Sequence, residues 1–340
     1  MQAITITRHG GPEVLDIRSV PDPEPGPGQV LVEVRAAGLN FAEVMARKGL
    51  YPDAPKPPCV VGYEGAGVVE ALGPGVSGPA IGTRVLFLSR FGAHASKVCV
   101  DAEQAIPMPE KMNFEAAAGL PVTYLTAYHM LFQVARIRGG ERILIHMAAG
   151  GVGTAVLQLC RTVPDVVTYG TASAKKHDAI RAQGCTHPID YRSKDYVEEI
   201  RSLTGGRGVD LVLDPLGGAD WKKGYSLLAP AGMLIAFGLA NANTGGKRNL
   251  FNVLGQLARV PRFSPMKLMD ANRTVSGVNM GHLFSERDLL LRHMQALMGL
   301  YEAGKIDPVL GGSYPFSRVT EAHAELEYGK NVGKIVLIPD

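Results

Sequence analysis

The chain has 340 residues, of which 46% are apolar, 20% are charged and 6% are aromatic. This length predicts two domains, and the apolar residues are sufficient for two cores, which excludes a disordered or collagen-like chain. The formal net charge is only +3, so we do not expect a general nucleic-acid-binding protein.

The first third of the chain is predicted to be β-rich. Alternating apolar residues indicate short strands over 2–7, 14–19, 30–36, 60–72 and 84–88, with turns of glycine and proline between them. The N-terminus lacks the basic region and the apolar stretch of a signal peptide, so none is expected.

From residue 114 onwards the pattern changes. Residues 114–132 have helical spacing that is interrupted by Gly119 and Pro121. Strands are then predicted at 142–146, 166–170, 186–190, 209–214, 232–238 and 274–278. Helices are predicted at 152–163, 174–183 and 196–203, with a further helix ending at Leu227 and Leu228. Apolar strands that alternate with helices predict an α/β fold with a doubly wound parallel (Rossmann) sheet. A helix near 285–303 and a last strand at 334–338 follow, and we expect this tail to return to the first domain.

The strongest functional signal is the stretch 142–153, R-I-L-I-H-M-A-A-G-G-V-G. An apolar strand that leads through a glycine-rich turn into a helix is the context of a dinucleotide-binding fingerprint. Such glycines let the backbone approach a pyrophosphate, whose charge then lies at the helix N-terminus. The stretch departs from G-x-G-x-x-G because Ala148 stands at the first glycine position. The apolar run 143–160 is therefore interpreted as a strand, turn and helix, and not as a membrane span.

The end of the second predicted strand favours NADP over NAD. An NAD site usually has a carboxylate there for the ribose 2′-hydroxyl, whereas this chain has Ser173, Lys175 and Lys176. A hydroxyl and two ammonium groups suit a 2′-phosphate, and Tyr191 follows the third strand. The alternative is that the two lysines only solvate the start of a helix.

These residues resemble a known family. The stretch 140–158 resembles the signature of the quinone oxidoreductase (zeta-crystallin) family of the medium-chain dehydrogenase/reductases, and segments 37–41 and 62–67 are similar to its N-terminal domain. Segments 170–173, 186–191, 214–218, 247–250 and 331–334 resemble the synaptic vesicle protein VAT-1 branch of that family. The short segments are weak alone, but their order along essentially the whole chain is specific.

The resemblance implies a Rossmann domain inserted into a GroES-like catalytic domain, with boundaries at 1–122, 123–283 and 284–340. It also implies a homodimer that pairs through the last strand of the nucleotide sheet, near 274–278. Asn40 and Thr126 would contact the nicotinamide of NADPH, and Tyr51 would lie in the cleft. The other implied cofactor residues are Ala149, Gly150, Gly151, Val152, Gly170, Ser173, Lys176, Tyr191, Leu216, Phe237, Gly238, Ser276, Gly277, Val278 and Asn331.

The zinc ligands of the superfamily's alcohol dehydrogenases are missing. Asn40 stands at the position of the cysteine ligand and Tyr63 at that of the histidine, so only Glu64 remains, and neither Asn nor Tyr is a usual zinc ligand. The four cysteines, at 59, 99, 160 and 185, have no C-x-x-C spacing, which excludes a zinc lobe or a disulfide framework and fits a reducing cytoplasm. We therefore predict no metal.

Without a metal, the chemistry favours acceptors that are already electrophilic, such as quinones or α,β-unsaturated carbonyl compounds. The oxyanion that develops on such an acceptor needs only hydrogen-bond donors and a proton. Tyr51 or water would supply the proton, while Asn40 would orient the nicotinamide amide. A purely structural role for Tyr51 is an equal alternative.

Residues 241–269 form a basic segment without Asp or Glu, in which Lys247, Arg248, Arg259, Arg262 and Lys267 alternate with apolar residues. A substrate lid, a dimer contact, weak docking on anionic lipid and an ordinary packed helix all fit this pattern. The leading function is an NADPH-dependent quinone or enone reductase. The alternative is an NADPH-binding protein that works chiefly through lipid or membrane association.

Overall fold

The computed structural model describes residues 1–243, 245–246 and 249–340, so Lys247 and Arg248 of the basic segment lie outside the described residues. The chain divides into two compact units. Unit 1 contains residues 1–125 and 283–340 together with Gly245 and Gly246, and unit 2 contains residues 126–243 and 249–282.

Unit 1 is built on two β-sheets. A small sheet has the order β2 (Leu15–Ser19), β1 (Gln2–Ile6) and β4 (Cys59–Val60). The larger sheet has the order β15 (Leu310–Pro315), β16 (Lys334–Ile338), β3 (Gln29–Leu39), β5 (Glu64–Leu72), β6 (Arg84–Leu88) and β8 (Ala105–Pro107), while β7 (Lys97–Asp101) also pairs with β3. Antiparallel pairing of β16 with β3 confirms that the tail of the chain returns to the N-terminal domain.

Five helices contribute to unit 1: α1 (Phe41–Arg47), α2 (Phe114–Gly119), most of α3 (Pro121–Tyr128), α10 (Arg287–Glu302) and α11 (Val319–Glu327). The main core lies on the larger sheet, where Val32, Val69, Val85 and Phe87 are buried. Burial of these alternate apolar side chains on one face explains the alternation in the sequence.

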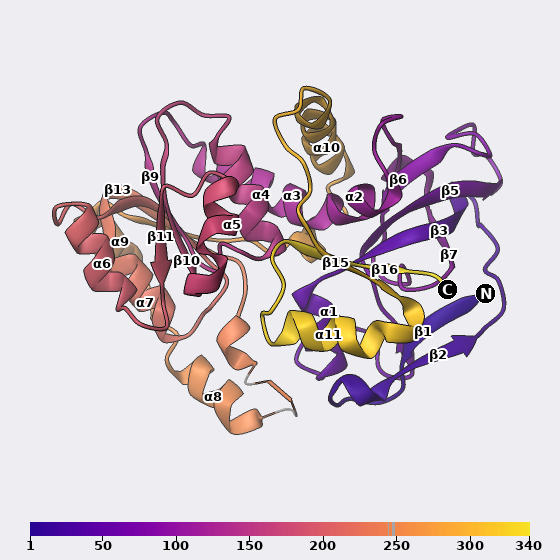
Figure 1. Ribbon diagram of the computed structural model, residues 1–340, viewed down its shortest axis with the longest axis horizontal. Helices are drawn as coiled ribbons and strands as arrows, with labels where there is room; N and C mark the ends of the chain where they lie inside the picture. Colours follow the sequence, from indigo (N-terminus) through magenta and orange to yellow (C-terminus); the bar gives the residue numbers. More distant parts are fainter. Residues whose placement is uncertain (244, 247–248) are drawn as a thin grey trace. The chain divides into compact units, whose positions relative to one another are not determined.

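Unit 2 is the predicted doubly wound fold. Its six strands are all parallel, in the order β11 (His187–Asp190), β10 (Val167–Ala172), β9 (Arg142–Ile145), β12 (Val209–Asp214), β13 (Leu228–Ala236) and β14 (Thr274–Gly277). The helices are α4 (Gly151–Cys160), α5 (His177–Ala182), α6 (Tyr196–Leu203), α7 (Ala219–Ser226), α8 (Leu250–Ala258) and α9 (Pro265–Ala271). Helices lie on both faces of the sheet, whereas α8 lies below it (Figure 1). The strand order reverses at β9, and ligands of such folds bind at the carboxyl ends of the strands beside this point.

Several predicted elements have different bounds in the structure. The predicted strand 60–72 is two strands, because the chain turns at Gly62, whose φ is +106° and where a Cβ would lie 2.6 Å from the backbone nitrogen of His94. In contrast, the predicted interruption of the helical stretch 114–132 is confirmed: α2 ends at Gly119, and Pro121 starts α3 because it has no N–H to continue the earlier helix. The helix predicted to end at Leu228 ends at Ser226, and Leu228 already belongs to β13, which begins before the predicted residue 232. Among the described residues, no helix is long and apolar enough to span a membrane.

Candidate cofactor and catalytic site

The turn after β9 leads directly into the N-terminus of α4. Met147 has a φ of +53°, and its carbonyl accepts a hydrogen bond from the backbone N–H of Gly150 (2.9 Å). Gly150 is the N-cap residue of α4, and no side chain of the described residues caps the helix. The N–H groups of the first turn are therefore available to an anion, which is the requirement of a pyrophosphate site.

Two glycines are required for close packing around this turn. A Cβ at Gly153 would lie 2.5 Å from the carbonyl oxygen of Met147 and 2.6 Å from the backbone of Ala148, so only glycine fits where α4 starts. On the neighbouring strand β10, a Cβ at Gly170 would lie 2.9 Å from the methyl group of Ala148. The methyl group that replaces the usual first glycine is therefore accommodated by a glycine on the next strand.

The ends of β10 and β11 bring together the residues predicted for a 2′-phosphate. The parallel register pairs Ala172 with Asp190, so Ser173 and Tyr191 both follow paired strand ends. Ser173 and Lys176 are buried, while Tyr191 is half-exposed. Arg192, which sequence reasoning missed, places its guanidinium 5.9 Å from the centre of the Tyr191 ring and adds a positive charge.

The carboxylate of Asp190, at the end of β11, forms hydrogen bonds within the loop that follows this strand. It accepts hydrogen bonds from the Ser193 hydroxyl (2.7 Å) and the Arg192 backbone N–H (3.2 Å). The bond from Ser193, with smaller backbone contributions, lowers the pKa of Asp190. Asp190 therefore has a structural role, unlike the carboxylate that binds the ribose of NAD.

The other predicted cofactor residues of unit 2 follow β12, β13 and β14 at the same edge of the sheet. The carboxylate of Asp214 accepts hydrogen bonds from the backbone N–H groups of Leu216 (2.6 Å) and Gly217 (3.1 Å), which shapes the loop containing Leu216. Phe237 and Gly238 follow β13, and the register places Ser276 and Gly277 beside the end of that strand. Val278 extends the pairing, because its N–H donates to the carbonyl of Ala236 (2.9 Å).

Two buried side chains that are not predicted site residues, His146 and Asp214, stabilise the loops at the carboxyl edge of the unit 2 sheet. The Nδ1 atom of His146 lies 3.1 Å from the Thr171 hydroxyl, and its ring meets the edge of Tyr196 at 4.7 Å. Burial lowers the pKa of His146 to about 4, so the imidazole is neutral, and burial raises the pKa of Asp214 to about 7. Their side chains therefore fix the turn after β9 and the loop after β12.

In unit 1, Asn40 is fully engaged by charged neighbours. It caps α1 in a capping box, in which its backbone N–H donates to Glu43 at 2.8 Å. Its side-chain Nδ2 donates to Glu64 (2.9 Å) and Glu43 (3.3 Å), and its Oδ1 accepts from Lys334 at 2.5 Å. These bonds occupy both N–H groups of the amide, so this arrangement suits a positioning role better than proton donation. The spacing N-x-x-E at 40–43 is the signal that predicts the capping box.

Tyr51 belongs to an aromatic cluster in unit 1. Its ring meets Tyr63 edge-on at 6.3 Å, and Tyr63 also contacts Phe91 (5.2 Å) and lies parallel to Phe284 (6.3 Å). Burial raises the pKa of Tyr51, a hydrogen bond with Tyr63 opposes this shift, and the charges of Asp53 and Glu43 add to it, so the hydroxyl keeps its proton. Half-buried Tyr51 therefore presents a neutral O–H group beside planar side chains.

The last two predicted contacts belong to different units. Asn331 is buried in the loop before β16, where its Nδ2 donates to the carbonyl of Gly333 (2.7 Å). Thr126 is buried on α3, in the part of that helix assigned to unit 2. Asn331 therefore belongs to unit 1 and Thr126 to unit 2.

The superfamily's zinc site does not fit the residues found here. Asn40, Tyr63 and Glu64 stand at the ligand positions, but Glu64 is bound by the ammonium of Lys334 (2.5 Å) and by the backbone N–H of Val122 (2.6 Å). Tyr63 is buried among aromatic rings, and burial raises the pKa of its phenol further above the ordinary value. Within residues 1–243, 245–246 and 249–340, no group of three or more His, Cys, Asp or Glu side chains has a metal-binding arrangement.

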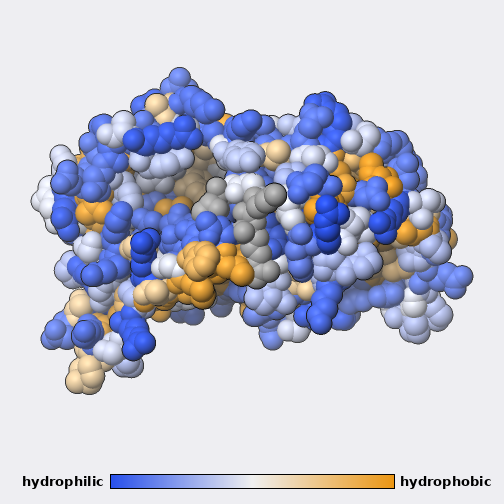
Figure 2. Space-filling model, turned by 90° about the horizontal axis from the view of Figure 1, so that it is seen from below, coloured by the Kyte–Doolittle hydropathy of each residue, from blue (hydrophilic) through white to orange (hydrophobic). Residues whose placement is uncertain are grey.

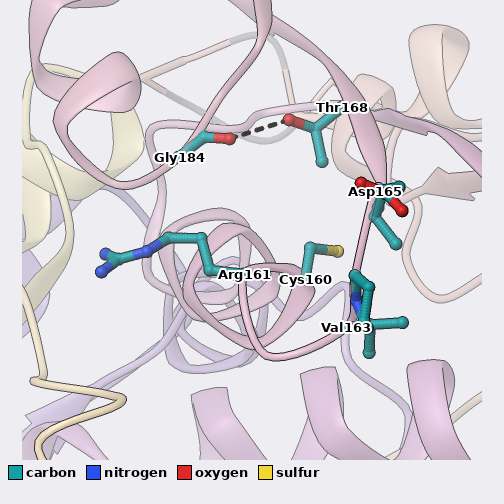
Figure 3. Close-up of a pocket in the computed structure, with 8 residues that line it drawn as sticks. Cys160, Arg161, Val163, Asp165, Thr168 and Gly184 are labelled. Carbon is teal, nitrogen blue, oxygen red and sulfur yellow. Dashed lines mark hydrogen bonds between the residues drawn. The ribbon is translucent and has the colours of Figure 1, made fainter. Parts of the chain in front are cut away.

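A separate cavity of about 390 Å³ lies at the opposite, amino-terminal end of β10 (Figure 3). It is lined by the end of α4, the loop that follows it, and Gly184, whose carbonyl accepts a hydrogen bond from Thr168 (3.0 Å). No predicted site residue lines it. Burial raises the pKa of the Cys160 thiol there to about 12, so this cysteine is not a reactive thiolate.

Comparisons with known proteins agree with both units. A family model described as alcohol dehydrogenase GroES-like domain matches residues 26–110, and one described as zinc-binding dehydrogenase matches residues 183–337. The chain is 46% identical over 341 residues to the synaptic vesicle membrane protein VAT-1 homolog of Rattus norvegicus, covering 100% of this chain and 84% of the relative.

Two quinone oxidoreductases are also similar. The human enzyme is 30% identical over 342 residues, covering 99% of this chain and 98% of the relative. The crystal structure of the Escherichia coli enzyme, complexed with NADPH, covers 100% of both chains with a TM-score of 0.88 and 30% identity.

Proposed function

We propose that this chain is an NADPH-dependent, zinc-independent oxidoreductase that reduces quinones or α,β-unsaturated carbonyl compounds. The chain belongs to the medium-chain dehydrogenase/reductase superfamily and to its group of VAT-1 homologs and quinone oxidoreductases. The observation that carries this proposal is the pairing of an uncapped α4 N-terminus with Ser173 and Lys176 at the neighbouring strand end. The first suits a pyrophosphate and the second a 2′-phosphate.

The residues of unit 2 fit the cofactor. The N–H groups after Gly150 would hold the pyrophosphate, with Ala149, Gly151 and Val152 around them, and Ser173, Lys176, Tyr191 and Arg192 would hold the 2′-phosphate. The solved structure of a 30% identical quinone oxidoreductase contains NADPH, which supports this choice of cofactor. When bound, NADPH supplies a hydride.

The residues of unit 1 would serve the acceptor. Hydride addition to a quinone or enone leaves negative charge on the acceptor oxygen, which hydrogen-bond donors stabilise. The Tyr51 hydroxyl keeps its proton at neutral pH and would donate it to this oxygen. Asn40 would act by its fixed position, because its side-chain N–H groups are bound to Glu43 and Glu64.

A screen of electrophilic acceptors tests this function. Purified protein is mixed with NADPH and either simple quinones, enones, or unactivated ketones and aldehydes as controls, and cofactor oxidation is followed by absorbance. Turnover with quinones or enones and none with the controls is the expected result. Binding of NADPH without turnover of any activated acceptor would contradict the proposed enzyme.

A second candidate function is membrane association, and an exposed apolar patch on α8 favours it. Phe251 is 90% exposed, and Leu250, Leu254 and Leu257 of the same helix are also exposed; the patch is visible from below (Figure 2). Arg259, Arg262 and Lys267 follow this helix, and the relative from Rattus norvegicus is named a vesicle membrane protein. Apolar and basic side chains together suit an anionic lipid surface.

Vesicle co-sedimentation tests this second candidate. Wild type and Phe251→Ser/Leu254→Ser are compared on anionic and on neutral vesicles, with NADPH binding as the control for folding. Binding to anionic vesicles that the double substitution abolishes would favour membrane association. Equal sedimentation of both proteins would exclude α8 as the contact.

We also propose a cytoplasmic homodimer. β14 is the edge strand of the unit 2 sheet, so its outer backbone groups are available for pairing with a second copy. Light scattering measures the mass. A dimer that Val275→Pro converts to a monomer with an intact fold is expected, and a wild-type monomer would contradict the proposal.

A further inference from the structure

Three adjacent strands of unit 1 bring an ammonium, an amide and a carboxylate to one point. Lys334 begins β16, Asn40 follows β3, and Glu64 begins β5, and these strands are neighbours in the order β16-β3-β5. Ile335 pairs with Leu39, and Ala37 pairs with Gly65, so the strand registers bring all three residues to the same end. The position of Lys334 is therefore fixed by the sheet.

The contacts of Lys334 are short and removed from solvent. Its Nζ lies 2.5 Å from Asn40 Oδ1 and 2.5 Å from Glu64 Oε1. The side chain of Lys334 is 4% exposed and that of Glu64 is 0% exposed. Glu43, also fully buried, lies on the other side of Asn40 and accepts from its amide. One ammonium thus faces a buried site with two carboxyl groups and an amide oxygen.

Buried carboxylates require a compensating positive charge, because transfer of an unpaired charge out of water is costly. In a metal enzyme a divalent cation bound to oxygen ligands supplies this charge. Here the carboxylate and amide oxygens that such a cation would bind are both held by Nζ of Lys334. An ammonium has three N–H donors and no lone pair, so it satisfies these oxygens and itself binds no metal.

We propose that Lys334 is the resident cation of this site: its ammonium takes the place of a divalent metal between Asn40 and Glu64, neutralises Glu64, and fixes the Asn40 amide. Lys334 is thus a positioning residue, and its effect on turnover rests on the proposed reductase function. Its effect on cation binding does not, because it depends only on the contacts of Nζ. The sequence signal is a lysine that begins an otherwise apolar strand, K-I-V-L-I.

Chemical rescue tests the proposal. Lys334→Ala removes the ammonium and leaves space for methylammonium or a metal ion, Lys334→Arg keeps the charge, and Lys330→Ala is the control, an exposed lysine of the preceding loop. Melting temperatures are measured in methylammonium chloride and in matched sodium chloride. We expect methylammonium to raise the melting temperature of Lys334→Ala by roughly 2–4 °C, and to leave wild type and Lys330→Ala unchanged.

Metal binding gives a second readout that needs no turnover. Titration with Mn²⁺ alone is expected to show binding to Lys334→Ala, loss of that binding in Lys334→Ala/Glu64→Gln, and none in wild type. Specific Mn²⁺ or Zn²⁺ binding by the wild type that Glu64→Gln abolishes would overturn the proposal. So would a folded Lys334→Ala protein that responds to neither methylammonium nor Mn²⁺.

Steady-state kinetics then distinguish a positioning role of Lys334 from a role in folding alone. For the acceptor that the screen identifies, Lys334→Ala is expected to lower kcat on the order of 100-fold, with the KM for NADPH nearly unchanged and with partial recovery in methylammonium. If Lys334→Ala does not fold, Lys334→Arg is compared with Lys334→Met: equal stability and equal kcat in the two would overturn the proposal. If no acceptor is turned over, the proposed function fails, while the melting and Mn²⁺ results still decide the role of Lys334.

Discussion

The methyl group of Ala148 occupies the space that Gly170 leaves on the neighbouring strand. A Cβ at position 170 would lie 2.9 Å from the Ala148 methyl group and 2.7 Å from the sulfur of Cys185. The backbone N–H of Ala148 also donates to the carbonyl of Thr171 at 3.1 Å, which ties the turn to β10. The pair explains how a cofactor turn keeps its shape without the usual first glycine.

Gly170→Ala is therefore expected to displace the turn after β9. Overpacking of this kind costs about 1–3 kcal/mol, and we expect weaker NADPH binding together with lower stability. Ala148→Gly in the same chain should restore part of both losses, because it removes one of the two close contacts. Isothermal titration with NADPH and denaturant unfolding of the single and double variants measure the coupling. Strictly additive effects would show that the two positions are independent.

The preference for NADPH over NADH is expected to depend on the side chains that follow β10 and β11. Ser173→Ala and Lys176→Ala are each expected to raise the KM for NADPH on the order of 10-fold while leaving that for NADH nearly unchanged, because only NADPH has the 2′-phosphate. Arg192→Ala should act in the same direction with a smaller effect, since its guanidinium is exposed. Lys222→Ala is the control, as Lys222 is an exposed lysine on α7 that is not assigned to the 2′-phosphate. Equal loss with both cofactors would contradict the assignment.

Tyr51 is expected to supply the proton in turnover. Tyr51→Phe removes the hydroxyl and keeps the ring, so kcat should fall on the order of 100-fold with little change in NADPH affinity. Tyr328→Phe, at an exposed tyrosine of the same unit, is the control. Stopped-flow kinetics with quinones and enones give the rates. A variant as fast as wild type would mean that water supplies the proton.

The pattern of the sequence predicts the parts of the fold that depend on local periodicity. The strands at 84–88, 209–214 and 334–338 have the predicted bounds, because each is an apolar run bounded by turns. The same pattern does not predict helix α1 or strands β7 and β15. Seven-residue α1 depends on its capping box and on burial of Arg47, which no periodicity reveals.

The candidate site likewise has one part that local sequence predicts and one part that it does not. The turn 147–153 is contiguous, so sequence alone indicates a dinucleotide site there. The Lys334–Asn40–Glu64 cluster is formed by residues almost 300 positions apart, which only strand pairing brings together. The sequence alone therefore does not indicate which residues Lys334 contacts. The strand order β16-β3-β5 places it beside Asn40 and Glu64.

Glu43 is expected to make stability depend on pH. Burial, together with the nearby charge of Glu64 and despite the opposing effect of Lys334, raises its pKa from 4.5 to about 7. The folded protein thus holds a proton that the unfolded chain releases between pH 4.5 and 7, so the free energy of unfolding falls as pH rises through this range. The full effect is about 3 kcal/mol.

Glu43→Gln should abolish this part of the pH dependence, because an amide does not titrate. The difference between wild type and variant isolates Glu43 from Asp214, which has a similar raised pKa, and from His94 and His146, whose lowered pKa values act in the opposite direction. Urea unfolding at several pH values gives the curves. Parallel curves for the two proteins would show that Glu43 is already ionised in the folded state.

A second buried charge cluster in unit 1 is expected to be essential for stability. Glu327 on α11 pairs with Arg47 and, at 2.6 Å, with Lys48, and all three side chains are at most 1% exposed. Glu327→Gln would leave two buried cations without a carboxylate, and breaking such a cluster costs about 3–5 kcal/mol. Glu325→Gln, less buried on the same helix, is the control. We expect thermal unfolding at a much lower temperature for Glu327→Gln alone, and partial recovery when Lys48→Met removes one of the two cations. Comparable melting temperatures for the two glutamine variants would show that water or a counter-ion, and not Glu327, balances these charges.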